Sequence, residues 1–396
     1  MPIDGVAKMP LQASIFTPGR IIIRTEGVFM EETIIRKVAE NFNFSGNFIS
    51  FVENNSGNIN KTFVLTYDDN GKTVKYTLQK LNTYVFKNPY EVMDNILKVS
   101  EHLKEKLIEN YGSCDRRVLE VILSKEGKPY YESNEEGFWR AFIYVDNARA
   151  YNAVENPSQF YAGGKAFGEF QKFLADFDAS TLYETIKDFH NTPKRIQTFL
   201  NAVAEDKAGR KDTVKDEISF IIDRADEAVS IQNMIDEGRL PLRVTHNDTK
   251  FNNVLLDDET GEGLCVIDLD TVMPGTSLFD FGDAVRSGAS TAAEDEKDLS
   301  KVSFDLELFE LFTKGFIEST DGFLTDAEIT LLPLGAKIIT LELASRFLAD
   351  YLDGDLYFKT DYPEHNLDRT RTQLKLVADI EKKFDKLDEI VSKYRK

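Results

Sequence analysis

Hydrophobic and polar positions alternate with a strand-like period in the first third of the chain. A helix is expected before these strands at 29–42, and a longer one follows the pair Asn88-Pro89 at 90–111. Strand-like runs occur at 47–53, 62–67, 73–81, 117–123, 128–132 and 138–145. The triplet Asp69-Asn70-Gly71 is a strong hairpin signal between the second and third runs. This part is therefore predicted to form a five-strand antiparallel sheet with helices.

After about residue 146 the apolar residues recur at helical spacing. Helices are expected at 159–177, 193–205, 214–237, 280–287, 303–316, 326–351 and 367–393. One strand–turn–strand unit at 243–270 interrupts them. The pattern predicts an α+β protein with an N-terminal sheet lobe at 1–145, a helical lobe at 146–396 and a hinge near 142–146.

The strand–turn–strand unit carries the most informative polar residues of the chain. It reads RVTHNDTKFNNVLLDDETGEGLCVIDLD, so Asp248 and Asn253 lie in a loop after one strand and Asp268 ends the return strand. Phosphoryl transfer from Mg-ATP needs a carboxylate that holds and deprotonates the accepting hydroxyl, together with oxygen ligands for magnesium. These three residues supply that set.

The order H-x-D-x-x-x-x-N followed by a strand-end Asp matches the catalytic loop of protein kinases. However, Ile267-Asp268-Leu269-Asp270 replaces D-F-G, and no A-P-E segment follows. The chain thus resembles the aminoglycoside phosphotransferase/choline kinase superfamily, and the string THNDTKFNN…VIDLDTVMPG resembles its N-acetylhexosamine 1-kinase branch. The resemblance implies a protein-kinase-like bilobal fold with a small antiparallel-sheet N-lobe and a larger, mainly helical C-lobe. It also implies ATP and Mg²⁺ as cofactors and a site between the lobes.

Each loop residue has a functional and a plainer interpretation. Asp248 is the favoured catalytic base, the alternative being a turn cap, and Asn253 and Asp268 are assigned to magnesium. Asp270 either adds a second metal contact or is an ordinary loop residue. His246 is expected to be a scaffold residue that bonds backbone near the metal-binding Asp.

Other charged residues flank this loop. Lys250 either neutralises charge on the transferring phosphoryl group or faces solvent. Asp280 and Asp283, in FDFGDAVR, are expected to hold the catalytic loop by accepting backbone N–H bonds.

Nucleotide contacts are expected on the third strand of the sheet. Strand alternation puts Leu78 and Lys80 on one face, where Leu78 would contact adenine and Lys80 the α- and β-phosphates. The alternative register turns Gln79 inward and Lys80 to the surface. A small polar loop between the first two strands would cover the phosphates with backbone N–H groups and includes Asn54, Asn55, Ser56 and Gly57.

Arg346 and Asp350 stand four apart in an otherwise apolar helix candidate. The segment LELASRFLADYL resembles the sugar-contacting helix of the hexosamine kinases, which makes this pair the first substrate candidate. The alternative is an i,i+4 salt bridge on a helix face.

A net charge of −20 argues against nucleic acid and fits poorly with an anionic membrane surface. No secretory signal is visible and no run reaches the ~18 apolar residues of a membrane span, so the cytoplasm is expected. The expected partners are a nucleotide and a small-molecule sugar acceptor, phosphorylated at its anomeric hydroxyl. A cationic acceptor (an aminoglycoside or choline) and a catalytically inactive kinase-fold binding protein are alternatives. The particular sugar, the nucleotide preference and the oligomeric state stay open.

Overall fold

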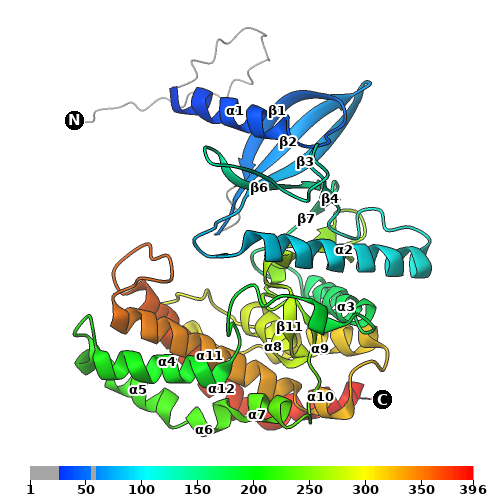
Figure 1. The fold of residues 1–396 in the computed structure, drawn as a ribbon. Helices are drawn as coiled ribbons and strands as arrows, with labels where there is room; N and C mark the ends of the chain where they lie inside the picture. The colour runs from blue at the N-terminus through cyan, green and yellow to red at the C-terminus, as the bar shows by residue number, and fades with distance from the viewer. Residues whose placement is uncertain (1–25, 55–58, 396) are drawn as a thin grey trace, which may run out of the picture.

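A computed structural model describes residues 26–54 and 59–395 of the chain. Figure 1 shows a twisted sheet at one end of the molecule and a larger bundle of helices at the other, with α2 (Pro89–Tyr111) lying between them. The fold is the predicted α+β arrangement of a small antiparallel sheet lobe and a mainly helical lobe.

The first sheet contains six strands, one in each of the six predicted strand-like runs, where a five-strand sheet was expected. Its order is β1-β2-β3-β6-β4, with β5 paired to β6, and every pair is antiparallel. The strands are β1 (Asn47–Asn54), β2 (Lys61–Asp69), β3 (Lys72–Lys80), β4 (Val121–Ile122), β5 (Tyr131–Ser133) and β6 (Gly137–Ile143). Asn70 and Gly71 adopt positive φ in the turn between β2 and β3, which matches the twist of a tight hairpin.

Helices cover both faces of this sheet. On one face, α1 (Glu26–Ala39) buries Ile35 and Val38 against side chains of β2 and β3. On the other, α2 packs its apolar stripe against Phe138 and Phe142 of β6 and reaches α3 (Pro157–Phe173) of the helical part. Asn95 of α2 also donates to the Val272 carbonyl at 2.9 Å. The sheet is thereby held over the segment that carries Asp268.

The rest of the chain is mainly helical. It contains β7 (Ala148–Arg149), which pairs with the hairpin β9 (Val254–Asp257) and β10 (Gly263–Val266), and a ribbon of β8 (Arg243–Thr245) and β11 (Met273–Gly275). Its remaining helices are α4 (Thr192–Glu205), α5 (Lys215–Ile222), α6 (Ala225–Ala228), α7 (Ser230–Asp236), α8 (Ser277–Gly288), α9 (Leu306–Thr320), α10 (Asp326–Thr330), α11 (Leu332–Asp353) and α12 (His365–Tyr394). No helix in the described part of the chain combines the length and apolar character needed to cross a bilayer.

Two predicted helices are broken. The segment predicted as 214–237 forms α5, α6 and α7, because Arg224 turns back onto the Phe220 carbonyl and pairs with Glu381 of α12, which bends the chain around that helix. The segment predicted as 326–351 divides into α10 and α11 before Pro333. Proline lacks the N–H that a helix interior needs but fits the first turn of a new helix.

Glycines allow α3 and α9 to pack at short range. A methyl group on Gly168 would lie 2.6 Å from the Phe316 oxygen and 2.9 Å from the Ser319 Cβ, and one on Gly164 would collide with the Phe312 carbonyl. The close approach fixes the platform on which Phe251, at the end of the catalytic loop, is packed.

We expect Gly168→Ala to lower the free energy of unfolding by about 1–3 kcal/mol, because overpacking outweighs the gain of roughly 1 kcal/mol in helix propensity. Urea denaturation measures the change. Lys172→Ala, which removes only a surface ion pair with Asp321 on the same helix pair, should cost less than about 1 kcal/mol. Equal losses in both variants would contradict a steric origin.

Candidate active site

The catalytic loop lies between β8 and β9 and is held by a carboxylate of α8. Asp280 accepts the backbone N–H groups of His246 and Asn247, each at 2.8 Å. Its side chain also receives Gln171 Nε2 at 2.5 Å, and its carbonyl receives Thr249 Oγ1. Burial raises the pKa of Asp280 above its ordinary value, and the two backbone donors oppose that rise. Asp280 thus holds the loop in the way the sequence suggested.

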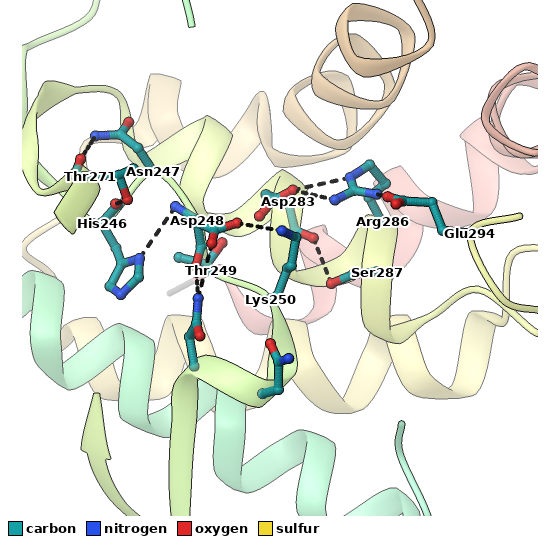
Figure 2. A network of polar contacts seen from close by, with 12 residues as sticks. His246, Asn247, Asp248, Thr249, Lys250, Thr271, Asp283, Arg286, Ser287 and Glu294 are labelled. Carbon is teal, nitrogen blue, oxygen red and sulfur yellow. Dashed lines mark hydrogen bonds and ion pairs between the residues drawn. The ribbon is translucent and has the colours of Figure 1, made fainter. Parts of the chain in front are cut away.

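Asp248 and Lys250 lie side by side in this loop (Figure 2), and Asn253 also contacts Asp248. Asn253 Nδ2 donates to the Asp248 carbonyl at 2.7 Å and to its Oδ2 at 3.2 Å. Lys250 Nζ lies 3.0 Å from Asp248 Oδ1. Burial raises the pKa of Asp248, but Lys250 and then His246 outweigh it, so the pKa lies below its ordinary value. Asp248 is therefore a carboxylate at neutral pH.

Asp268 follows β10 in a left-handed conformation, with φ of 60°. It is exposed to solvent, and its side chain receives no hydrogen bond or ion pair from the described residues. The dense protein around it raises its pKa to about 7, and the nearby carboxylates of Asp270 and Asp248 add to the rise. A divalent cation would relieve this accumulation of negative charge.

The donor set suits a hard cation that also binds phosphates. Because Asn253 uses its amide nitrogen on Asp248, its Oδ1 is left for a ligand, and its backbone carbonyl accepts the N–H of Ile267, the residue before Asp268, at 2.9 Å. Over the described ranges, no three His, Cys, Asp or Glu side chains form a metal cluster. Asn253 and Asp268 could hold a cation such as Mg²⁺ that takes few protein oxygens and completes its shell with phosphate and water.

His246 supports this loop from behind. It is fully buried, its Nε2 lies 2.8 Å from the Ile267 carbonyl, and its Nδ1 accepts the Asp248 N–H at 3.3 Å. Phe167 and Phe170 contact its ring edge-to-face. These are the contacts of a scaffold residue that joins Asp248 to the segment before Asp268.

The structure corrects the register expected for the nucleotide-binding strand. Leu78 is fully buried in the core beneath α1, and Lys80, on the same face, lies with its Nζ 5.7 Å from the Trp139 ring centroid. Gln79 points to the opposite face, where its Oε1 accepts Arg140 Nε at 2.9 Å. Leu78 and Lys80 do share a face, but it is the one away from Asp268, because alternation alone does not say which face a helix covers.

Arg140 of β6 is the cation on the cleft face of the sheet, and sequence reasoning missed it. Its guanidinium forms a buried ion pair with Asp270. Asp270 also accepts Asn60 Nδ2 at 2.7 Å, so its two oxygens are engaged by the sheet lobe. Asp270 is therefore an inter-lobe brace rather than the additional metal ligand considered above. The sequence feature that could have identified Arg140 is that it is the one charged residue within the apolar run FWRAFIYV.

Comparison with known proteins agrees with this geometry. The model of the phosphotransferase enzyme family matches residues 50–303. The chain belongs to this phosphotransferase family.

Solved structures share the fold of this phosphotransferase at low sequence identity. An aminoglycoside phosphotransferase from Alicyclobacillus acidocaldarius has a TM-score of 0.59 at 11% identity, covering 90% of this chain and 96% of its own. A choline kinase from Cryptosporidium parvum has a TM-score of 0.56 at 15% identity, covering 92% and 99%. A spectinomycin phosphotransferase in complex with ADP and spectinomycin has a TM-score of 0.52 at 13% identity, covering 92% and 98%. At these identities the likeness establishes the protein-kinase-like fold.

The predicted substrate pair of the phosphotransferase is not an ion pair. Asp350 accepts the backbone N–H groups of residues 356–358 and Asn366 Nδ2, so both its oxygens hold the loop after α11. This overturns Asp350 as a substrate contact and as a partner of Arg346. The Arg346 guanidinium lies instead among the rings of Phe189, Tyr357 and Phe358, and no described residue offers it a hydrogen-bonding oxygen.

Most of the predicted phosphate loop cannot be placed. Asn54 is the exposed last residue of β1, whereas Asn55, Ser56 and Gly57 lie outside the described residues. Asp283 does not hold the catalytic loop as expected, because its carboxylate binds Arg286.

Arg140→Met should lower the free energy of unfolding by about 3–5 kcal/mol, because it leaves the buried Asp270 carboxylate without its counter-charge. Asp270→Asn should also destabilise. The double variant should be more stable than the sum of the two losses predicts, and denaturant unfolding of all four proteins measures this coupling. If the loss in the double variant equals the sum of the losses in the two single variants, the coupling energy between Arg140 and Asp270 is zero and the ion pair does not stabilise the protein.

Proposed function

We propose that this phosphotransferase is a Mg-ATP-dependent kinase that phosphorylates a hydroxyl of a small sugar, the anomeric hydroxyl of an N-acetylhexosamine. The observation that carries the proposal is the convergence of Asp248, Lys250 and Asn253, with Asp268 near enough to feel the charges of Asp248 and Lys250. The family match supports phosphoryl transfer, and the sugar comes from the resemblance of the THNDTKFNN and LELASRFLADYL strings.

Asp248 acts on the acceptor. Its carboxylate accepts the hydrogen bond of the acceptor hydroxyl and orients the oxygen towards the γ-phosphorus. A bond forms between that oxygen and phosphorus while the bond to the leaving ADP oxygen breaks, and the hydroxyl proton passes late to Asp248. A lowered pKa suits this role, because the transition state is loose and needs orientation more than a strong base.

Positive charge beside the transferred group comes from two sources. Lys250 is close enough to Asp248 to contact an equatorial phosphoryl oxygen. Mg²⁺ held by Asn253 Oδ1 and Asp268 would neutralise the phosphate oxygens. Arg140, on the cleft face of the sheet, is proposed as the residue that replaces the expected Lys80 near the phosphates.

The surroundings of Arg346 favour a sugar over choline as acceptor. A quaternary ammonium needs an aromatic cage, yet the rings of Phe189, Tyr357 and Phe358 already surround the Arg346 guanidinium. Its N–H groups can instead donate to sugar oxygens. Turnover of choline or kanamycin in a labelled-ATP screen, with none of any N-acetylhexosamine, would overturn the sugar assignment.

Asp248→Asn should lower kcat by about 10²–10⁴-fold, because the proton acceptor is lost while the shape of the loop is kept. Sugar-dependent ADP release measures the rate, and calorimetry should give an unchanged Kd for the nucleotide. Asp298→Asn, in an exposed helix cap, is the control and should behave as wild type. Undiminished turnover in the Asp248 variant would remove that residue as the base.

Asp268→Asn should abolish the gain in ADP affinity that Mg²⁺ gives the wild-type protein, because an amide is a weaker ligand than a carboxylate. Titrations with ADP in Mg²⁺ and in EDTA measure the difference. Both proteins should bind ADP equally in EDTA. A full Mg²⁺ effect in the variant would exclude Asp268 from the metal site.

A further inference from the structure

Asp283 of α8 carries a buried carboxylate oxygen without a partner. Its Oδ1 receives two hydrogen bonds from Arg286, from Nε at 3.1 Å and from Nη2 at 2.7 Å. Its Oδ2 is shielded from solvent and receives no hydrogen bond from any described residue. The residue is only 6% exposed. Buried polar atoms are nearly always hydrogen-bonded, and an exception beside an active site calls for a ligand.

Asp283 lies close to the catalytic loop. Figure 2 shows Asp283 beside Lys250, which itself contacts Asp248. The electrostatics agree, because Asp248 is the main cause of the raised pKa of Lys250, burial opposes it, and Asp283 is the next carboxylate to raise it. A ligand hydroxyl at Asp248 would therefore have neighbouring groups within reach of Asp283.

The neighbours of Asp283 hold its carboxylate in place and leave Oδ2 as an acceptor. Arg286 pairs with Oδ1 and is itself fixed by Glu294, at 3.0 Å, and by Gln373, at 3.4 Å. Lys250 lies nearby but forms its ion pair with Asp248. An O–H or amide N–H of a ligand would satisfy the free oxygen.

We propose that Asp283 Oδ2 accepts a hydrogen bond from a second hydroxyl or amide N–H of the acceptor, next to the hydroxyl that is phosphorylated. Asp283 thereby favours acceptors that carry a second donor group next to the reacting hydroxyl. This inference rests on the proposed kinase function and extends it to the substrate class.

Paired substrate and protein changes test the assignment. Each monodeoxy analogue of N-acetylglucosamine, and the analogue without the acetamido N–H, is compared with the parent sugar as acceptor for wild type and for Asp283→Asn. In wild type, one analogue should lose about 10- to 100-fold in kcat/KM, as expected for a hydrogen bond to a charged group. In Asp283→Asn, kcat/KM for the parent sugar should fall by a similar factor. The ratio of kcat/KM between the parent sugar and that analogue should then be less than about threefold. The KM for ATP should stay unchanged.

Glu294→Gln is the matched control, because it weakens the support of Arg286 from the opposite side without touching the orphan oxygen. Its discrimination among the analogues should equal that of wild type. If Asp283→Asn loses activity equally with every acceptor and keeps the discrimination, Asp283 has only a structural role and the inference is overturned while the kinase function stands. If wild type phosphorylates no acceptor in the series, the sugar-kinase proposal fails and the inference falls with it.

Discussion

The hydrogen bonds from the backbone of His246 and Asn247 to the Asp280 carboxylate are the interaction on which the active site depends. The loop cannot satisfy these donors itself, because Asn247 has a left-handed φ of 63° that turns its peptide away from the strand. Leaving two buried N–H groups unpaired would cost about 1–3 kcal/mol each. Asp280 can serve only if α8 is fixed, and Gly282 allows that helix to approach Gly335 of α11 closely. The position of Asp248 is therefore set by the packing of two helices far from it in sequence.

The electrostatics of the cleft follow from how its three aspartates are compensated. Asp248 has Lys250, and Asp270 has the buried Arg140. Asp268 has no ion pair among the described residues; the surrounding protein raises its pKa to about 7, and the carboxylates of Asp270 and Asp248 add to the rise. Because two of the three charges are already neutralised within the chain, the position beside Asp268 is the one where an added cation gains most. The same arrangement ties the sheet lobe to the helical lobe through Asp270.

The sequence alone predicted the structural features that depend on local residue patterns. The strands around Asp69-Asn70-Gly71 and the sheet-then-helix order were predictable, because periodicity and turn chemistry are local. The face of β3 that points toward Asp270 could not be predicted. A period of two tells which residues share a face, but not that α1 covers the face that carries Lys80. Asp350 was misread because most of its partners are backbone N–H groups of a later loop, which leave no side-chain signature, and its one side-chain partner, Asn366, is 16 residues away. Arg140 was visible only as a charge in an apolar strand, and its partner is 130 residues away.

Two unpaired polar groups bear on the proposed acceptor. Among the described residues, no oxygen receives a hydrogen bond from Arg346 and no donor reaches Asp283 Oδ2. His190 joins the Asn247 carbonyl, next to Asp248, to Glu342, one helical turn before Arg346, whereas Asp283 lies beside Lys250, which contacts Asp248. A hydroxyl both donates and accepts, so it could satisfy either group, whereas a trimethylammonium could satisfy neither. These groups give the proposed sugar acceptor a support that does not come from sequence resemblance.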